Sequence, residues 1–188
     1  MTQITVHRIL PMVKRFLAKV VASSDAVIDA TAGNGNETRY LAELVGEESC
    51  VYAFDVQQVA LATTAQKLGP LQSRVKLVHD GHENVLQYIK HPPIAVATFN
   101  LGYLSYANTG ITTKAQTTIQ AINAIVQSLK CGGIITVSIY QGHDDGAESS
   151  ALLVALSQLE QLAVHVARYE LINQRNHVLY LLLLEKLK

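Results

Sequence analysis

The chain contains 188 residues, a length that suits one domain. Hydrophobic residues make up 49% of it and charged residues 16%, a composition that fills a large core and argues against disorder. Fifteen basic and fifteen acidic side chains cancel, so nucleic-acid binding would need a local basic face. The most basic segment holds Arg8, Lys14, Arg15 and Lys19 with no acidic residue among them, and its simplest interpretation is a solvated helix face.

Two cysteines, Cys50 and Cys131, are too few for a disulfide framework or a cysteine-bound metal cluster. The apolar stretch at 178–184 is far shorter than the roughly 20 residues that a membrane span needs. The N-terminus lacks the basic-then-apolar-then-small order of a signal peptide. We therefore expect a cytoplasmic protein with reduced thiols and no membrane partner.

The elements alternate between short β-branched runs and longer helical patterns within one domain, 1–188. An N-terminal helical segment, 1–22, comes first, with Pro11 marking a break or a helix start. Five strands separated by helices follow, with the strands at 26–30, 51–54, 75–78, 94–99 and 134–139. The helices after these strands are expected at 37–45, 57–68, 83–89, 113–129 and 148–162.

The chain closes with two strands, near 165–172 and 178–185. The turn between them is too short for a parallel crossover, so they form an antiparallel hairpin. The pattern predicts an α/β fold: a mostly parallel seven-stranded sheet with a C-terminal antiparallel hairpin and helices on both faces. This is the Rossmann-like plan of class I methyltransferases, an argument by analogy of fold.

A glycine-rich loop joins the first strand to the first crossover helix. Glycines let the backbone approach a ligand closely, and the helix N-terminus offers unpaired N–H groups. The third glycine of a dinucleotide-binding loop is replaced by Thr38, which favours S-adenosylmethionine (SAM) over a dinucleotide. The predicted SAM-binding residues of this loop are Asp29, Thr31, Gly33, Asn34, Gly35 and Asn36, with Asp29 directed to the ammonium of the methionine moiety.

Two further aspartates follow the next two strands. Asp55 is placed to accept both ribose hydroxyls of a nucleoside, and Asp80 to meet the adenine edge. Gln57 and His82 complete the predicted cofactor pocket. A single aspartate here is more often a helix cap, but three acids at three successive strand tips favour nucleoside binding.

The segment Phe99-Asn100-Leu101-Gly102-Tyr103 follows the fourth strand and resembles the Asn-Pro-Pro-Tyr loop of amino-methyltransferases. In that loop, the Asn oxygen and a nearby carbonyl accept hydrogen bonds from the target amine, which aligns its lone pair with the methyl group. We expect Asn100 to contact both cofactor and amine, and Tyr103 to act in catalysis and substrate binding. The alternative is a polar turn with Tyr103 in the core.

Other polar side chains are expected over the same edge. His143 is a candidate for handling the proton of the amine. The predicted substrate-binding residues also include Tyr140, Asn173, Gln174 and Asn176, unless these are only hydrophilic turns. The segment 79–83 offers four potential metal ligands, but no second cluster supports it, so we expect no metal.

The cysteines give a negative prediction. Methylation at carbon 5 of a pyrimidine needs a cysteine nucleophile. Cys50 and Cys131 both come just before strands, at the opposite edge of the sheet. Methyl transfer to nitrogen or oxygen is therefore expected, and Asn100 favours nitrogen.

With these residues identified, the chain resembles the YtqB-like SAM-dependent methyltransferases, a family of putative rRNA methylases, over 28–186. The resemblance rests on DATAGNGNET, AFDVQ, HDGHEN, FNLGYL, ITTKAQTTIQAI, YQGH and INQRN. It implies an enzyme similar to the one that methylates the aminomethyl group of 5-aminomethyl-2-thiouridine at the tRNA wobble position. The chain departs from the family at 105–108, at Asp144-Asp145 and at His177-Val178, which affects the expected substrate more than the expected cofactor.

The resulting hypothesis is SAM-dependent N-methylation of RNA, with the anticodon region of tRNA as partner and a homodimer as one arrangement that would cover it. A small-molecule amine is the alternative substrate, which suits the neutral net charge. A SAM-binding module without catalysis and an NAD-linked dehydrogenase are the remaining alternatives.

Overall fold

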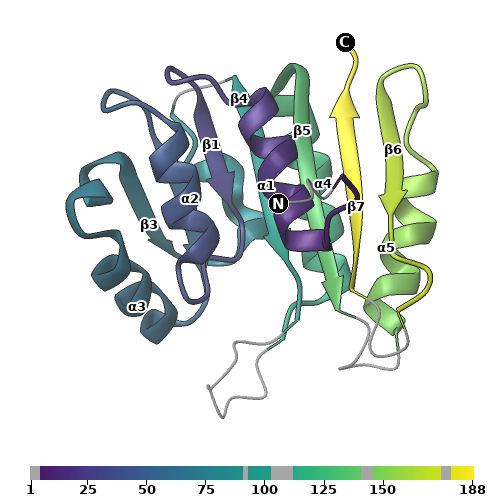
Figure 1. Ribbon diagram of the computed structural model, residues 1–188, viewed down its shortest axis with the longest axis horizontal. Coiled ribbons are helices and arrows are strands. Elements are labelled where there is room, and N and C mark those ends of the chain that lie inside the picture. Colours follow the sequence, from purple (N-terminus) through teal and green to yellow (C-terminus); the bar gives the residue numbers. More distant parts are fainter. Residues whose placement is uncertain (1–4, 91–92, 103–111, 141–145, 175–178) are drawn as a thin grey trace.

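The computed structural model describes residues 5–90, 93–102, 112–140, 146–174 and 179–188. Their strands form one seven-stranded sheet in the order β3-β2-β1-β4-β5-β7-β6 (Figure 1). The strands are β1 (Ala26–Asp29), β2 (Val51–Asp55), β3 (Val75–His79), β4 (Ile94–Asn100), β5 (Leu129–Tyr140), β6 (Val164–Tyr169) and β7 (Leu179–Lys186).

Strands β1 to β5 pair in parallel, whereas β7 runs antiparallel to both of its neighbours, β5 and β6. The predicted sheet and its C-terminal hairpin are therefore confirmed. All parallel strands end at one edge, which we call the carboxyl edge and which lies at the bottom of Figure 1.

Helices cover both faces of the sheet. The described helices are α1 (Ile9–Val20), α2 (Asn36–Leu44), α3 (Gln58–Leu68), α4 (Ala115–Ser128) and α5 (Ala147–Ser157), with the 3-10 helices η1 (Gly69–Arg74) and η2 (His82–Gln87). Leu17 of α1 and Leu41 of α2 pack in one cluster with Val96 and Ile134 of the sheet. Ile122 of α4 packs in the other cluster, on the opposite face.

Two predicted element boundaries in the C-terminal half were wrong: the start of β5 and the end of α5. Strand β5 begins at Leu129, so the predicted turn at Cys131-Gly132-Gly133 lies inside the strand. The strand accommodates it with a positive φ of 72° at Gly132 and a shift of its register with β4. Cys131 thus lies within β5, although still near its amino end, and Cys50 immediately precedes β2 as expected.

The helix expected to reach residue 162 ends at Ser157. The N–H groups of Gln158 and Leu159 bond to carbonyls three residues earlier, which tightens the last turn. The Glu160 carbonyl then accepts from both Ala163 and Val164 and leads the chain into β6.

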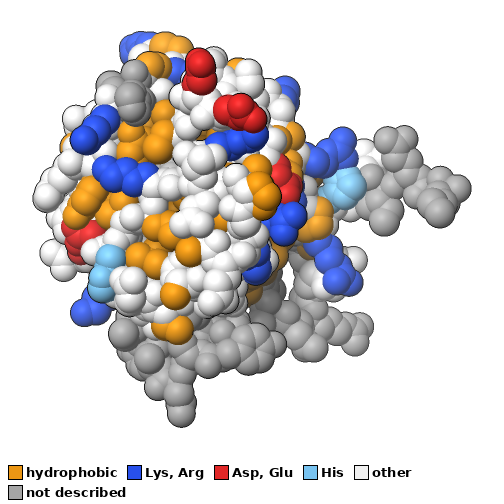
Figure 2. Space-filling model, turned by 90° about the vertical axis from the view of Figure 1, so that its left-hand side faces the viewer, with side chains coloured by type: hydrophobic (Ala, Val, Ile, Leu, Met, Phe, Trp, Pro, Cys, Tyr) orange, Lys and Arg blue, Asp and Glu red, His pale blue; other side chains and the backbone are white. Residues whose placement is uncertain are grey.

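Charged side chains are distributed unevenly over the surface. Seen from the α3 side, Lys and Arg side chains gather toward the right of Figure 2, the side of the sheet that α1 and α2 cover.

None of the helices in the described ranges combines the length and apolarity that crossing a bilayer requires.

Candidate active site

The carboxyl edge brings together the polar residues that follow separate strands. Asp29, Asp55 and Asn100 are the last residues of β1, β2 and β4, and Asp80 directly follows β3. Because β3, β2, β1 and β4 are successive neighbours in the sheet, these four residues form one row across its edge. Ligands of open parallel sheets bind at this edge.

The glycine loop has the backbone geometry predicted for it. Gly33 and Gly35 have positive φ angles of 51° and 73°, and Gly35 is the N-cap of α2. A Cβ atom on Gly35 would lie 2.9 Å from the Cα of Thr64 in α3, so only glycine fits there. The Gly33 carbonyl accepts a hydrogen bond from the Thr64 hydroxyl at 3.2 Å.

Asp29 is fully buried beneath this loop. Its carboxylate accepts hydrogen bonds from the Thr38 hydroxyl at 2.6 Å and from the Thr31 N–H at 3.2 Å. Burial, with a smaller contribution from the negative charge of Glu37, raises the pKa of Asp29 to about 7. Thr38 therefore has a role that the sequence analysis missed: it joins the acid at the strand tip to the first turn of α2.

The Asp55 carboxylate joins the glycine loop to the turn that follows β2. One oxygen accepts from the Gly33 N–H and the other from the Gln57 N–H, each at 2.9 Å. An ionised carboxylate offers about four lone-pair sites. Each Asp55 oxygen thus retains capacity for a ligand hydroxyl.

Asp80 accepts three hydrogen bonds from its own turn. Their donors are the Gly81 N–H, the Asn84 amide and the Tyr88 hydroxyl, at 2.7, 2.9 and 2.7 Å. The hydrogen bond from Tyr88, followed by that from Asn84, lowers the pKa of Asp80. The residue is ionised, and its bonds to Asn84 and Tyr88 fix the turn around η2. The N-cap of η2 is Gly81, without a side-chain cap, and contact of Asp80 with adenine stays a prediction.

His82 contributes a buried acceptor. Its Nδ1 donates to the Ala30 carbonyl at 3.1 Å, and its ring lies edge-on to Phe99. Burial lowers the pKa of His82, so the ring is neutral and Nε2 carries a free lone pair. No described residue offers the buried Nε2 a hydrogen bond, which fits a site that receives a donor group from a ligand.

Asn100 presents a second such atom. Its backbone N–H donates to the Thr31 hydroxyl at 2.7 Å, which ties β4 to the glycine loop. Its side-chain Oδ1 is buried and has no hydrogen-bond partner among the described residues. The amide oxygen predicted to accept from a target amine is therefore unsatisfied in this structure.

Tyr140 at the end of β5 lies near this position. A Cβ atom on Gly102 would stand 3.9 Å from the Tyr140 Cβ. Burial and the charge of Glu37 in α2 raise the pKa of the Tyr140 phenol. Tyr140 is thus close to both the Asn100 loop and the helix that begins at the glycine loop, and Glu37 is a neighbour that the sequence analysis did not identify.

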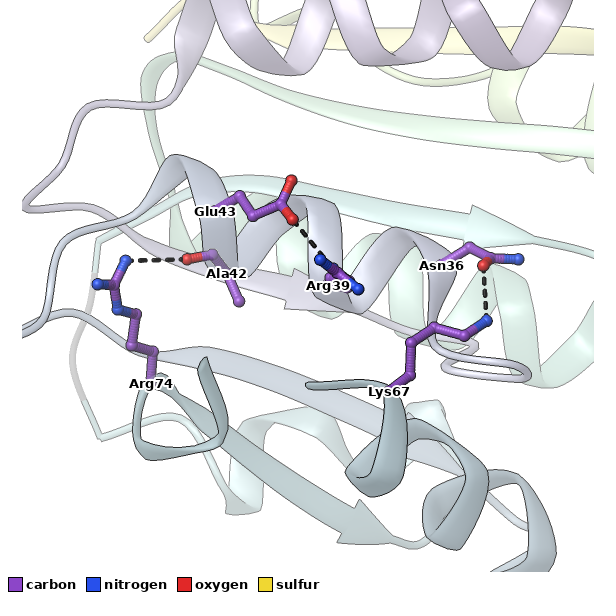
Figure 3. A network of polar contacts seen from close by, with 6 residues as sticks. All are labelled: Asn36, Arg39, Ala42, Glu43, Lys67 and Arg74. Atoms are coloured by element: carbon purple, nitrogen blue, oxygen red, sulfur yellow. Dashed lines mark hydrogen bonds and ion pairs between the residues drawn. The ribbon is translucent and has the colours of Figure 1, made fainter. Parts of the chain in front are cut away.

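The other predicted residues are less central. Asn173 and Gln174 are exposed in the turn after β6, at the carboxyl edge but beyond β7. Figure 3 shows that the Asn36 side chain accepts a hydrogen bond from Lys67 of α3 at 2.7 Å, so it joins two helices. Tyr103, His143 and Asn176 lie outside the described residues.

Thr113 is hydrogen-bonded to Gly102 and to α5. Gly102 donates to the Thr113 hydroxyl, which in turn donates to Glu148 of α5 at 2.9 Å, and the Thr113 N–H donates to the Gly102 carbonyl. A cavity of about 460 Å³ lies beside this contact and is lined by residues that include Lys114. Among the residues described, no group of three or more His, Cys, Asp or Glu side chains is placed to hold a metal ion.

Residues 51–185 match the protein family described as "Putative rRNA methylase". The chain belongs to this family. Membership confirms the predicted family and the prediction that the protein is a methyltransferase.

Solved structures of family members and relatives have the same architecture. A putative rRNA methylase from Clostridium thermocellum is 41% identical with a TM-score of 0.94, over 98% of this chain and all of the other. A putative methyltransferase from Streptococcus mutans, solved with S-adenosylhomocysteine (SAH), is 38% identical with a TM-score of 0.88, over 97% of this chain and all of the other.

A curated relative adds a substrate in its name. The chloroplastic tRNA (mnm5s2U34)-methyltransferase of Arabidopsis thaliana is 34% identical over 148 residues, which cover 73% of this chain and 54% of the relative. The chain thus spans about half the length of this relative.

Proposed function

We propose that this member of the rRNA methylase family transfers a methyl group from SAM to the aminomethyl nitrogen of a tRNA wobble 2-thiouridine. The family and the tRNA methyltransferase relative support an RNA substrate. The unpartnered Oδ1 of Asn100 at the carboxyl edge carries the proposal of an amine, because a buried amide oxygen without a donor is matched by an N–H of the substrate.

SAM is confirmed as the cofactor of these methyltransferases by the relative that binds SAH. When bound, SAM supplies a methyl group that its sulfonium charge has already activated. In our proposal Asp55 accepts the ribose hydroxyls, while Asp80 and the His82 Nε2 receive the adenine amine. The Gly33–Gly35 backbone contacts the methionine moiety, and the Asp29 charge attracts its ammonium through the loop that it supports.

The residues of the chain act by positioning. Asn100 Oδ1 accepts an N–H of the neutral amine, so that the nitrogen lone pair points at the methyl carbon. In this displacement the N–C bond would form as the methyl–sulfur bond of SAM breaks, which gives a secondary ammonium ion and SAH. His143 and Tyr103 remain proposed partners in this step, for amine deprotonation and for packing on the substrate.

Nucleoside mass spectrometry of tRNA from cells that lack the protein tests this function. We expect 5-aminomethyl-2-thiouridine to accumulate and its methylaminomethyl form to disappear, with recovery when the wild-type gene is returned. An unchanged nucleoside profile would contradict the proposed substrate.

The neutral net charge favours a second candidate, a small-molecule amine as substrate. Competition between tRNA and free amines for labelled methyl groups separates the two. The single-domain arrangement over 1–188, the cytoplasmic location, the homodimer and the substrate contacts of Tyr140, Asn173, Gln174 and Asn176 stay predictions.

A further inference from the structure

Ser138 of β5 is a buried polar residue at the carboxyl edge that the function proposed above does not use. It is the register partner of Asn100 across the β4–β5 pair. Alternation along a strand places paired residues on the same face of the sheet. This face is the one covered by α1 and α2, since Val96 and Ile134, four residues before each, pack in that cluster.

The preceding pair on the same face shows how such side chains meet. Thr98 and Thr136 are register partners, and the Thr136 hydroxyl donates to the Thr98 hydroxyl at 3.0 Å. Two residues nearer the edge, Asn100 and Ser138 make no such bond. Within the described part of the chain, the Ser138 Oγ and the Asn100 Oδ1 are both buried without a hydrogen-bond partner.

The remaining neighbours do not offer Ser138 a polar partner along its row. On the other side, its register partner in β7 is the fully buried Leu181. Asn100 is flanked on its far side by the glycine loop, where Thr31 binds its backbone. Two register partners at this edge therefore each carry an unsatisfied oxygen, next to the loop assigned to the methyl donor.

We propose that Ser138 is a substrate-positioning residue whose Oγ accepts one N–H of the acceptor amine while Asn100 Oδ1 accepts the other. This inference rests on the proposed function. A neutral primary amine has two N–H groups and one lone pair, so two acceptors satisfy it and leave the lone pair for the methyl carbon. Both oxygens are shielded from solvent among the residues that the structure describes.

The arrangement also predicts selectivity for a single transfer. The methylated product is a secondary amine, which in its neutral form has one N–H. In the same pose it would leave one oxygen unsatisfied and press its methyl group against it. Ser138 thus favours the primary amine over its own product.

The test compares wild type, Ser138→Ala and Ser149→Ala, the last a matched loss of a buried hydroxyl that bonds Tyr180 instead. Transfer to a primary amine and to its N-methyl form is measured on the same RNA. We expect Ser138→Ala to lower kcat/KM for the primary amine about tenfold and to leave the secondary amine within about threefold. Tm should not fall, because the Oγ has no partner to lose.

Binding of 5-aminomethyl-2-thiouridine to the SAH complex, measured by calorimetry, gives a readout that does not need turnover. Weaker binding in Ser138→Ala alone supports the role. Equal binding in wild type and Ser138→Ala, or an unchanged ratio of primary to secondary rates, overturns it while the proposed function stands. No binding or transfer to any amine by wild type overturns both.

Discussion

Asn100 combines a fixed backbone with an unsatisfied side chain. Its N–H is held by Thr31, and its Oδ1 has no partner in the described structure. Replacing Asn100 with Ala removes the acceptor without touching the contacts of the glycine loop. We expect methyl transfer to fall at least about 100-fold, because misalignment of the amine is costly, while SAM affinity stays within about threefold.

Single-turnover transfer and calorimetric SAM binding measure these two quantities. Asn123→Ala, at an exposed position of α4, is the matched control and should leave both unchanged. A rate near that of wild type in Asn100→Ala would remove the assigned role.

Asp29 gives the protein a pH dependence of stability. Its pKa is raised from 3.8 in an exposed carboxyl to about 7 by burial, so the folded state favours the protonated form. Its contribution to stability is complete at pH values below the unfolded pKa and is lost as pH rises toward the folded pKa. We expect Tm of wild type to fall, relative to that of Asp29→Asn, between about pH 4 and pH 7.

Thermal unfolding of both proteins over this range checks the sign. Parallel Tm curves would show that Asp29 does not titrate in the folded protein.

SAM affinity should move in the opposite direction. Ionised Asp29 attracts the ammonium of the donor, so we expect wild-type affinity to increase as pH rises toward about 7. The Asp29→Asn variant should lose this increase while sharing any titration of SAM itself. Calorimetric titrations at matched ionic strength measure the difference, and identical pH profiles would argue against an interaction with Asp29.

At the scale of the element, the glycine loop depends on its fit against α3. Gly35 combines a positive φ of 73° with a position where a Cβ would meet Thr64 at 2.9 Å. We expect Gly35→Ala to lower the free energy of unfolding by about 2–4 kcal/mol, from the left-handed backbone and the overlap together. SAM affinity should fall with it.

Gly132→Ala separates the two causes. Gly132 has a φ of 72° with nothing within 4 Å of its added Cβ, so only the backbone cost of about 1–2 kcal/mol applies. Denaturant unfolding of both variants provides the comparison. Equal losses would mean that the Thr64 contact does not constrain the loop.

Most elements could be predicted because their local patterns agree with the fold. β-branched runs gave the strand positions, and the short final connection required antiparallel strands. The start of β5 could not be predicted, since Cys131-Gly132-Gly133 has the composition of a turn, and only pairing with β4 keeps it in the sheet. The end of α5 was missed because its apolar pattern continues past Ser157. The helix ends there because the next N–H groups bond to carbonyls three residues earlier.

At the scale of the whole molecule, topology gathers residues that are distant in the chain. The three aspartates could be placed at one edge from sequence, because each follows a parallel strand. Thr38 and Ser138 could not be assigned, since their roles depend on packing against Asp29 and on register with Asn100. Tyr103 and His143 lie outside the described residues, so their predicted roles stay predictions.

The balanced net charge means that RNA binding must use a local face. Helix α1 contains Lys14, Arg15 and Lys19 at exposed positions and no acidic residue. We expect tRNA binding to weaken steeply with salt, and Lys19→Glu to weaken it and reduce the slope of log affinity against log salt by about one. Lys90→Glu, exposed between β4 and η2, which packs on the face of the sheet opposite α1, is the control.

Fluorescence anisotropy over a salt series measures these slopes. Identical slopes for wild type and Lys19→Glu would mean that Lys19 faces solvent and does not contact tRNA. A flat salt response of the wild type would favour a small-molecule substrate.

The most direct measurement of the central claim is transfer of a labelled methyl group from SAM to purified tRNA that carries 5-aminomethyl-2-thiouridine. We expect one methyl group per tRNA, located on the aminomethyl nitrogen and dependent on Asn100. Labelling of a ring position, equal labelling of tRNA that lacks the aminomethyl group, or no labelling by a folded, SAM-binding enzyme would contradict it.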